Sequence, residues 1–326
     1  MRKSEAVPDE ITDIINSNRS FLLTSHRNPD GDAVGSILAM ADILKTMKKE
    51  TYIFLEDGVP EIYRFLPHAD EVNTILEGNF NVTLVMDCEN EKRVSERIDL
   101  RRHARMLINI DHHPTTGSFG DYRYIDPGAA AVGEQVYALA RVLNVTVGRD
   151  AAECIYVSIL TDTGSFKYSN TTAHTHRLAA GLIEHGLHPA DIASRIYERR
   201  SIDQLRLQAA VIEDMTVDGP LAWSAISSDM LEALGLAEAD FDGAIDIVRS
   251  VDGVEVAVLF TQRPDGKVKT SLRSKSKFSV LEVSRELGGG GHKAAAGFLS
   301  TDPLPVVVKK TVRLLRERLG QGGVHE

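Results

Sequence analysis

The chain has 326 residues and a hydrophobic content of 43%, so it can bury more than one hydrophobic core and two domains are expected. Its formal net charge of -10 at pH 7 argues against a protein that coats long nucleic acid, because such proteins hold the phosphate backbone with an excess of basic side chains. A disulfide framework and a zinc ribbon are also excluded, because the two cysteines, Cys88 and Cys154, have no metal-ligand spacing.

The N-terminal segment and the apolar runs predict the compartment. Residues 1–13 are charged and lack the apolar core of a signal peptide. No apolar run reaches the roughly 18 residues that a membrane span needs. We therefore expect a cytoplasmic protein with no membrane partner.

Short apolar runs alternate with longer helical patterns in the first half of the chain. This alternation predicts an α/β domain built on a parallel sheet. Further helices are expected to continue to about residue 200. The predicted strands are 21–25, 51–55, 81–86 and 105–110, and the predicted helices are 32–48, 130–143 and 150–160.

A charged segment without glycine separates this domain from the rest of the chain. We predict a larger α/β domain at 1–190, a helical connector at 191–212 and a smaller α+β domain at 213–326. In the last of these, the predicted strands are 221–227 and 254–260, and the predicted helices are 228–236, 240–249 and 306–319.

The first polar motif, SHRNPDGDAVGS at residues 25–36, follows a predicted strand and precedes a predicted helix. Ligands of open α/β sheets bind at such strand ends, and Pro29 and Gly31 allow a turn in which nearby side chains converge. The three candidate ligands are His26, Asp30 and Asp32. The alternative is an Asn-Pro-Asp-Gly turn with Asp32 capping the helix.

Three more acidic positions occur at predicted element ends. Asp87 ends a continuous apolar run, and Asp111, His112 and His113 end another. Asp162 ends a helical run, where the helix dipole disfavours a carboxylate. Each position alone has a structural alternative as a loop cap or turn residue, but their joint occurrence in one domain favours a site.

The candidate ligands are carboxylates and imidazoles. Hard oxygen ligands with two imidazoles suit Mn²⁺ or Mg²⁺ better than a closed structural zinc site. The predicted metal ligands are His26, Asp30, Asp32, Asp87, His112 and Asp162.

At these residues the chain resembles the DHH phosphoesterase superfamily, whose name describes the triplet at 111–113. The segment LGGGGHKAAAGF at 287–298 resembles the signature of the DHH-associated C-terminal domain. The resemblance covers essentially the whole chain, and together the motifs are similar to the NrnA-like group of oligoribonucleases and nucleotide phosphatases. It implies that 1–190 is the DHH catalytic domain and that 213–326 is the DHH-associated, substrate-binding domain.

The resemblance implies a two-metal site. His113 would face the scissile phosphate, and Asp111 would orient the histidine loop. The implied ligands are His26 and Asp30 for one ion, Asp32, His112 and Asp162 for the other, and Asp87 between both. Two Mn²⁺ ions are expected, with Mg²⁺ as the alternative.

The C-terminal half contains candidates for substrate binding. Lysines and arginines at odd positions in 267–277 would line one face of a strand, either as a basic strip for phosphate or as a solvated edge that prevents aggregation. The glycine run 288–291 would let the backbone approach an anion closely, or would act as a hinge. The predicted substrate contacts are Arg93, Arg273, Ser274, Gly290, Gly291, His292 and Lys293.

The resemblance implies hydrolysis of short oligoribonucleotides to nucleoside monophosphates. The alternatives are removal of the 3'-phosphate from adenosine 3',5'-bisphosphate and cleavage of cyclic dinucleotides or pApA. From another class, a nucleotide-binding protein without catalysis is less favoured. The expected partner is short RNA or a small nucleotide, with no stable complex with long nucleic acid, and a homodimer is compatible with the resemblance. Ala131 and Val132 stand where related sequences are expected to carry serine or threonine at one or both positions. The resemblance therefore predicts the exact substrate less well than it predicts the metal site.

Overall fold

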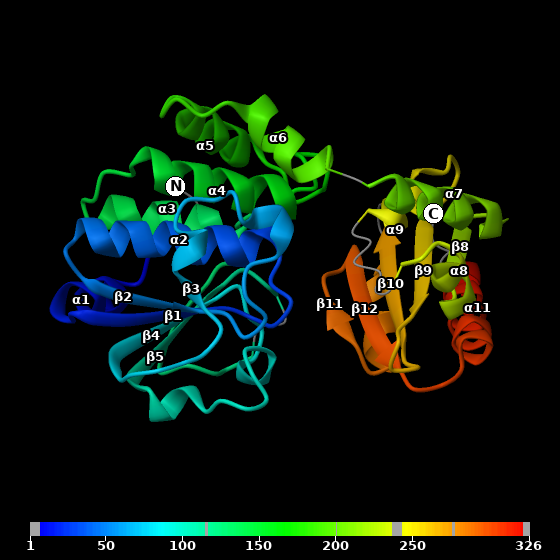
Figure 1. Ribbon diagram of the computed structural model, residues 1–326, viewed down its shortest axis with the longest axis horizontal. Helices are drawn as coiled ribbons and strands as arrows, with labels where there is room; N and C mark the ends of the chain where they lie inside the picture. The colour runs from blue at the N-terminus through cyan, green and yellow to red at the C-terminus, as the bar shows by residue number, and fades with distance from the viewer. Residues whose placement is uncertain (1–6, 115–116, 200, 237–242, 276–277, 322–326) are drawn as a thin grey trace. The chain divides into compact units, whose positions relative to one another are not determined.

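The chain forms two compact units, unit 1 at Met1–Arg199 and unit 2 at Arg200–Glu326, whose elements are drawn in Figure 1. The structure is a computed structural model, and it describes residues 7–114, 117–199, 201–236, 243–275 and 278–321. The segment predicted as a connector contributes helix α6 (Pro189–Tyr197) to unit 1 and helix α7 (Ile202–Asp214) to unit 2.

Unit 1 contains a six-stranded parallel sheet with the strand order β3-β2-β1-β4-β5-β6. The strand order reverses between β1 and β4, which is where open α/β sheets bind ligands. The strands are β1 (Ser20–Thr24), β2 (Glu50–Phe54), β3 (Val72–Asn73), β4 (Phe80–Met86), β5 (Ala104–Asp111) and β6 (Tyr122–Ile125). The helices are α1 (Asp9–Ser17), α2 (Gly31–Thr46), α3 (Val132–Val142), α4 (Arg149–Asp162), α5 (Ala173–Ile183) and α6, with short 3-10 helices η1 (Glu61–Tyr63), η2 (Ala69–Glu71), η3 (Glu91–Arg93) and η4 (Leu100–Arg102).

The two faces of this sheet are covered differently. Alternate strand residues such as Leu23 and Leu84 pack with the buried side chains of α1 to α6 in one large core. Their neighbours Leu22 and Val85 face a smaller core that includes residues of the η3 and η4 region. The segment between β4 and β5 therefore helps to cover the second face of the sheet, and it also carries candidate site residues.

Helix α2 is almost entirely buried, and its N-terminus sets the position of the first motif. Asp30 is its N-cap and accepts hydrogen bonds from the backbone N–H groups of Asp32 and Ala33, both at 3.0 Å. Asp32 lies inside the first turn instead. The alternative in which Asp32 caps the helix is therefore wrong, because Asp30 already fills that position.

The predicted α/β class is confirmed, and each predicted strand of unit 1 lies within one residue of an observed strand at each end. The predicted helices correspond to α2, α3 and α4. Strands β3 and β6 and helix α1 were not predicted. Both strands are short and lie at the edges of the sheet, where partial exposure removes the continuous apolar pattern of a buried strand.

Unit 2 contains a second six-stranded sheet with the order β11-β12-β10-β9-β8-β7, in which only β8 and β9 are parallel among the described pairs. The strands are β7 (Thr216–Asp218), β8 (Leu221–Ile226), β9 (Val256–Gln262), β10 (Val268–Ser274), β11 (Gly290–Gly291) and β12 (Ala295–Ser300). The helices are α7, α8 (Ser228–Ala233), α9 (Ala244–Ser250), α10 (Val280–Glu286) and α11 (Leu304–Gln321). Residues 240–242 of the predicted helix 240–249 lie outside the described residues.

The predicted basic strip is shorter than expected, because β10 ends at Ser274. Only Lys269 and Arg273 come from the strand itself. Lys267 precedes the strand and pairs with Asp265 at 3.2 Å, while the ammonium group of Lys275 donates to the backbone oxygen of Val251 at 2.7 Å. Lys277 lies outside the described residues.

Among the described residues, no helix combines the length and the apolar character that a bilayer crossing requires.

Candidate metal centre

The six predicted metal ligands come together at one edge of the unit 1 sheet. They follow β1, β4 and β5 or lie at the ends of α2 and α4, at the point where the strand order reverses. Three groups of three residues can be defined in which each residue offers one ligand atom and these three atoms all lie within 4.8 Å of one another. The groups are His26, Asp30 and Asp87, then Asp32, His112 and Asp162, and finally Asp87, Asp111 and His113.

Asp87 belongs to the first group and also lies close to the second. Its Oδ2 is 3.6 Å from His26 Nε2, and its Oδ1 is 3.7 Å from His112 Nε2. The residue is 2% exposed, and its backbone has a φ of 52°, a left-handed conformation that is rare outside glycine, asparagine and aspartate. Its Oδ1 has no hydrogen-bond partner among the described residues. A buried carboxylate with an unpaired oxygen is costly unless a cation is bound to it.

The spacing of the ligand atoms fits shared coordination better than direct hydrogen bonds. His112 Nε2 is 3.6 Å from Asp32 Oδ2 and 3.6 Å from Asp162 Oδ2. Hydrogen bonds between such atoms are shorter, at about 2.7–3.2 Å. Two ligands that each lie about 2.1 Å from one ion are roughly 3.0–4.2 Å apart, depending on the angle between them. The residues present therefore fit a divalent metal.

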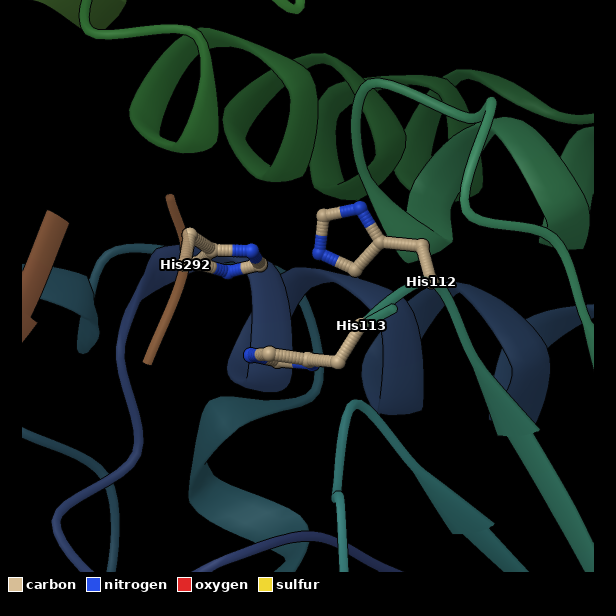
Figure 2. A group of neighbouring side chains, drawn as sticks. All are labelled: His112, His113 and His292. Atoms are coloured by element: carbon tan, nitrogen blue, oxygen red, sulfur yellow. The ribbon is translucent and has the colours of Figure 1, made fainter. Parts of the chain in front are cut away.

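The histidines are held by one ring nitrogen and present the other. His26 Nδ1 lies 2.8 Å from the backbone oxygen of Arg27, and His112 Nδ1 lies 3.1 Å from that of Ala129. A carbonyl oxygen can only accept, so Nδ1 is the donor in both rings and Nε2 is left for a metal. Figure 2 shows the rings of His112 and His113 beside one another, with an edge-to-face centroid distance of 5.1 Å.

Asp111 holds the histidine loop in place. It is 0% exposed, and its Oδ1 accepts hydrogen bonds from His112 N at 2.8 Å, His113 N at 3.3 Å and His113 Nδ1 at 2.7 Å. Burial alone would lower the pKa of His113, but the bond to Asp111 and the charge of Asp87 raise it to about 10. This contact orients His113 as the predicted role of Asp111 requires.

The Asp111→Asn variant tests this arrangement. We expect kcat for phosphate ester hydrolysis to fall about 10- to 100-fold, because the neutral amide oxygen of asparagine accepts these bonds without the negative charge that strengthens them. The free energy of unfolding should fall by about 1–3 kcal/mol. Steady-state kinetics and chemical denaturation measure the two effects. An unchanged kcat in a folded variant would mean that the loop does not depend on Asp111.

The charges of the cluster show why cations belong there. Burial raises the pKa of Asp32 well above its usual range, and the nearby charge of Asp87 adds to the rise. Burial also raises the pKa of Asp162 to about 6, although His112 opposes it. Burial would lower the pKa of His112, but Asp162 and Asp32 outweigh burial and raise the value to about 9. Protons thus offset the charge of the carboxylates, and metal ions would displace these protons on binding.

Arg93 lies in η3, near the first group. Its guanidinium is 3.3 Å from Glu89 Oε1, and its positive charge acts to lower the pKa of His26. The backbone oxygen of Arg93 accepts a hydrogen bond from Arg27 N at 2.8 Å, which ties the loop after β4 to the loop after β1. Arg93 is therefore positioned beside the cluster, while its role toward substrate stays a prediction.

The other predicted substrate contacts gather at one end of the unit 2 sheet. Arg273 pairs with Ala295 of β12, and Ser274 N donates to the backbone oxygen of Ala294 at 2.9 Å. The Ser274 hydroxyl donates to Phe278 O at 2.8 Å and is buried. On the other side of β12 lie Gly290 and Gly291 in β11, followed by His292 and Lys293.

Two residues of this glycine run approach neighbouring backbone tightly, and a Cβ atom at Gly289 would lie 2.1 Å from Gly297 O. Gly291 combines such an approach with a positive φ. Its φ is 125°, and a Cβ atom would lie 2.6 Å from Ala295 O. A Cβ atom at Gly290 would meet nothing within 4 Å. The conformation of Gly291 is thus required by the β11–β12 pairing, independently of any ligand.

Sequence reasoning missed residues that support the ligands. The side-chain amide of Asn170 donates to Asp162 O at 3.1 Å and Asp162 Oδ2 at 3.3 Å. The hydroxyl of Ser158 donates to Asp32 Oδ1 at 2.6 Å. Asn170 lies in a polar run shortly after Asp162, which is a weak signal. Ser158 lies in an apolar helix and gives none.

Comparison with known proteins identifies relatives along nearly the whole chain. The bifunctional oligoribonuclease and PAP phosphatase NrnA of Thermus thermophilus is 32% identical over 305 residues, which cover 92% of this chain and 90% of that protein. The protein of the same name from Bacillus subtilis is 30% identical over 286 residues, covering 85% of this chain and 88% of that protein. An exopolyphosphatase-related protein from Bacteroides fragilis has the same fold, with a TM-score of 0.86, 24% identity, and coverage of 96% of this chain and 95% of that one.

Two family models match the chain in order. The model of the DHH family, N-terminal domain, matches residues 20–159, and the model of the DHHA1 domain matches residues 229–321. The resemblance inferred from the motifs is thereby confirmed. The two matches, and the 32% identity over most of both chains, show that the chain belongs to the DHH family, with a DHH N-terminal domain followed by a DHHA1 domain.

Proposed function

We propose that the chain is a two-metal phosphoesterase that hydrolyses short oligoribonucleotides to nucleoside monophosphates. The observation that carries this proposal is the position of Asp87, whose two carboxylate oxygens lie 3.6 Å from His26 Nε2 in one ligand group and 3.7 Å from His112 Nε2 in the other. Two metal ions about 4 Å apart suit phosphate ester hydrolysis, because they stabilise both the attacking and the leaving oxygen.

We propose that the metal ligands divide between two ions as the family resemblance implies. His26 and Asp30 would hold one ion, Asp32, His112 and Asp162 the other, and Asp87 both. We propose Mn²⁺, with Mg²⁺ as the alternative, because imidazole ligands suit Mn²⁺ better while Mg²⁺ prefers oxygen. When bound, the ions supply Lewis acidity and lower the pKa of water.

The remaining residues of the cluster act on the substrate. Asp111 fixes Nδ1 of His113, so an imidazolium at this position donates from Nε2 to an oxygen of the scissile phosphate. Arg93, whose side chain is 42% exposed, would pair with a second phosphate oxygen. Each group neutralises charge that develops on the phosphoryl oxygens.

The DHHA1 domain would hold the rest of the substrate. Arg273, His292 and Lys293 supply donors at the end of the unit 2 sheet, and the backbone of Gly290 and Gly291 supplies close approach. The Ser274 hydroxyl already donates a hydrogen bond to Phe278 O. Ser274 would therefore contribute by its position next to Arg273 in the strand. A small set of donors favours a short substrate over a long strand.

Removal of the 3'-phosphate from adenosine 3',5'-bisphosphate is the second candidate function. It is supported by the bifunctional names of the two relatives, which describe both an oligoribonuclease and a PAP phosphatase. Cyclic dinucleotides and pApA are further candidates for the same site. A non-catalytic nucleotide binder is less favoured, because buried converging carboxylates are costly unless they bind cations.

We also propose that the enzyme acts in the cytoplasm and forms no stable complex with long nucleic acid. A homodimer is compatible with this proposal.

Product analysis on a substrate panel tests the function. The protein is incubated with Mn²⁺ and pApA, a pentaribonucleotide, a much longer single-stranded RNA, adenosine 3',5'-bisphosphate, cyclic di-AMP or pyrophosphate. We expect nucleoside monophosphate from the short RNAs and adenosine monophosphate from the bisphosphate, both dependent on metal. Equal turnover of the long strand would exclude the short-substrate preference, and activity on pyrophosphate alone would exclude the proposed function.

A further inference from the structure

The carboxylate of Asp32 is held by donors from three helices of unit 1. Its Oδ2 accepts a hydrogen bond from Val132 N, at the start of α3, at 2.8 Å. Its Oδ1 accepts from the hydroxyl of Ser36 in α2 at 2.8 Å and from that of Ser158 in α4 at 2.6 Å. Asp32 is 1% exposed and both serines are 0% exposed, so water does not compete for these bonds.

The direction of the hydrogen bonds distinguishes the two serines. Ser158 Oγ lies 3.0 Å from Gly133 N, which can only donate, so the single hydroxyl proton of Ser158 points to Asp32 Oδ1. Ser36 Oγ reaches both the backbone oxygen and Oδ1 of Asp32, so its one proton is divided between two acceptors. Ser158 therefore provides the undivided side-chain bond to Oδ1.

Close helix packing brings Ser158 to this position. A Cβ atom at Gly133 would lie 2.2 Å from Ser158 Oγ, so only glycine leaves room for the hydroxyl at the start of α3. A Cβ atom at Gly35 would lie 3.0 Å from Ser158 Cβ and 2.5 Å from Cys154 O. The two glycines let α2 and α3 approach α4 until a side chain as short as serine reaches Asp32.

We propose that Ser158 is a positioning residue that fixes the rotation of the Asp32 carboxylate, so that Oδ2 is presented to the metal held by Asp32, His112 and Asp162. The inference rests on the metal-binding role proposed above for Asp32. With Oδ1 saturated by hydroxyl donors, Oδ2 remains the oxygen nearest His112 Nε2, at 3.6 Å. Without Ser158 the carboxylate rotates more freely, and the ion loses a fixed ligand.

Calorimetric titration of Mn²⁺ into the metal-free protein tests the proposal, in two backgrounds that separate the sites. His26→Ala removes a ligand of the first group and leaves the Asp32 group, and Asp162→Asn does the reverse. Ser158→Ala should weaken Mn²⁺ binding about 10- to 100-fold in the His26→Ala background and leave it unchanged in the Asp162→Asn background. Ser158→Cys, which keeps a side chain of similar shape but is a weak donor, should shift the affinity in the same direction.

Cys154→Ala is the matched control for packing. Cys154 is buried on the same helix, one turn before Ser158, and loses one heavy atom in the same way. We expect it to leave both Mn²⁺ affinities unchanged. Equal weakening by Cys154→Ala, or weakening in both backgrounds, would overturn the proposal by pointing to packing alone. Binding of two Mn²⁺ ions with no effect of Ser158→Ala would overturn it while leaving the proposed function intact, whereas no binding by the wild type would overturn both.

Discussion

Replacement of Asp87 by alanine is expected to lower kcat/KM for short oligoribonucleotides by at least about 1,000-fold, or roughly 4 kcal/mol of transition-state stabilisation. Asp87 groups with His26 and Asp30, and its other carboxylate oxygen lies 3.7 Å from His112 Nε2 of the Asp32 group, so it is the proposed ligand of both ions. Its loss therefore weakens both ions at once. Loss of a ligand that serves a single ion, such as Asp162, should be less severe.

A second variant separates chemistry from backbone effects. Asp87 has a positive φ, which alanine adopts only at a cost of about 1–2 kcal/mol, whereas asparagine tolerates it well. Asp87→Asn should thus be as inactive as Asp87→Ala but more stable. Asp70, an exposed residue of η2, provides the control variant Asp70→Asn, which should retain full activity. Product release by Asp87→Asn at near wild-type rate, with wild-type Mn²⁺ content, would exclude a bridging role.

Removal of divalent metal is expected to lower the melting temperature of unit 1 by roughly 5–10 °C for each site that is saturated at about 100 times its Kd. Binding at that level contributes about 2.7 kcal/mol per site, because the ligands are assembled only in the folded state. The cluster also contains several buried carboxylates whose mutual repulsion the ions relieve.

Scanning calorimetry of the chelated and the Mn²⁺-loaded protein measures this shift. The six proposed metal ligands all belong to unit 1, so a transition assigned to unit 2 should not move. Asp32→Asn should remove most of the contribution of one site and leave the other. A melting profile that does not respond to chelation and Mn²⁺ would show that the cluster binds no metal in the folded protein.

The residues that the sequence located best are those that follow strands. Asp87 and Asp111 each end a continuous apolar run, and parallel strands with such runs end at one edge of a sheet. The convergence of the candidate ligands at one edge of the sheet could therefore be inferred without coordinates. The position of the cap could not, because Asp30 and Asp32 are both suited to an N-cap and only the turn geometry decides between them.

Residues that support the ligands from elsewhere in the chain were invisible to pattern analysis. Ser158 contacts a residue 126 positions away, and nothing in an apolar helix distinguishes its serine from an ordinary core residue. The basic strip was predicted to be too long for another reason. Alternation predicts which face a residue takes only while the strand continues, and β10 ends before Lys275.

Because the two faces of the unit 1 sheet are covered differently, the position of the site residues depends on loops being folded against one face. One face is covered by helices, but the other is sealed by side chains such as Val94 and Leu100 from the segments that follow β4. Cys88, the residue next to Asp87, is buried in the same small core. A fluctuation that lifts this cover would expose apolar side chains and move the proposed metal ligand Asp87 at the same time. Hydrophobic burial on this face would thus help to hold Asp87 in its left-handed conformation.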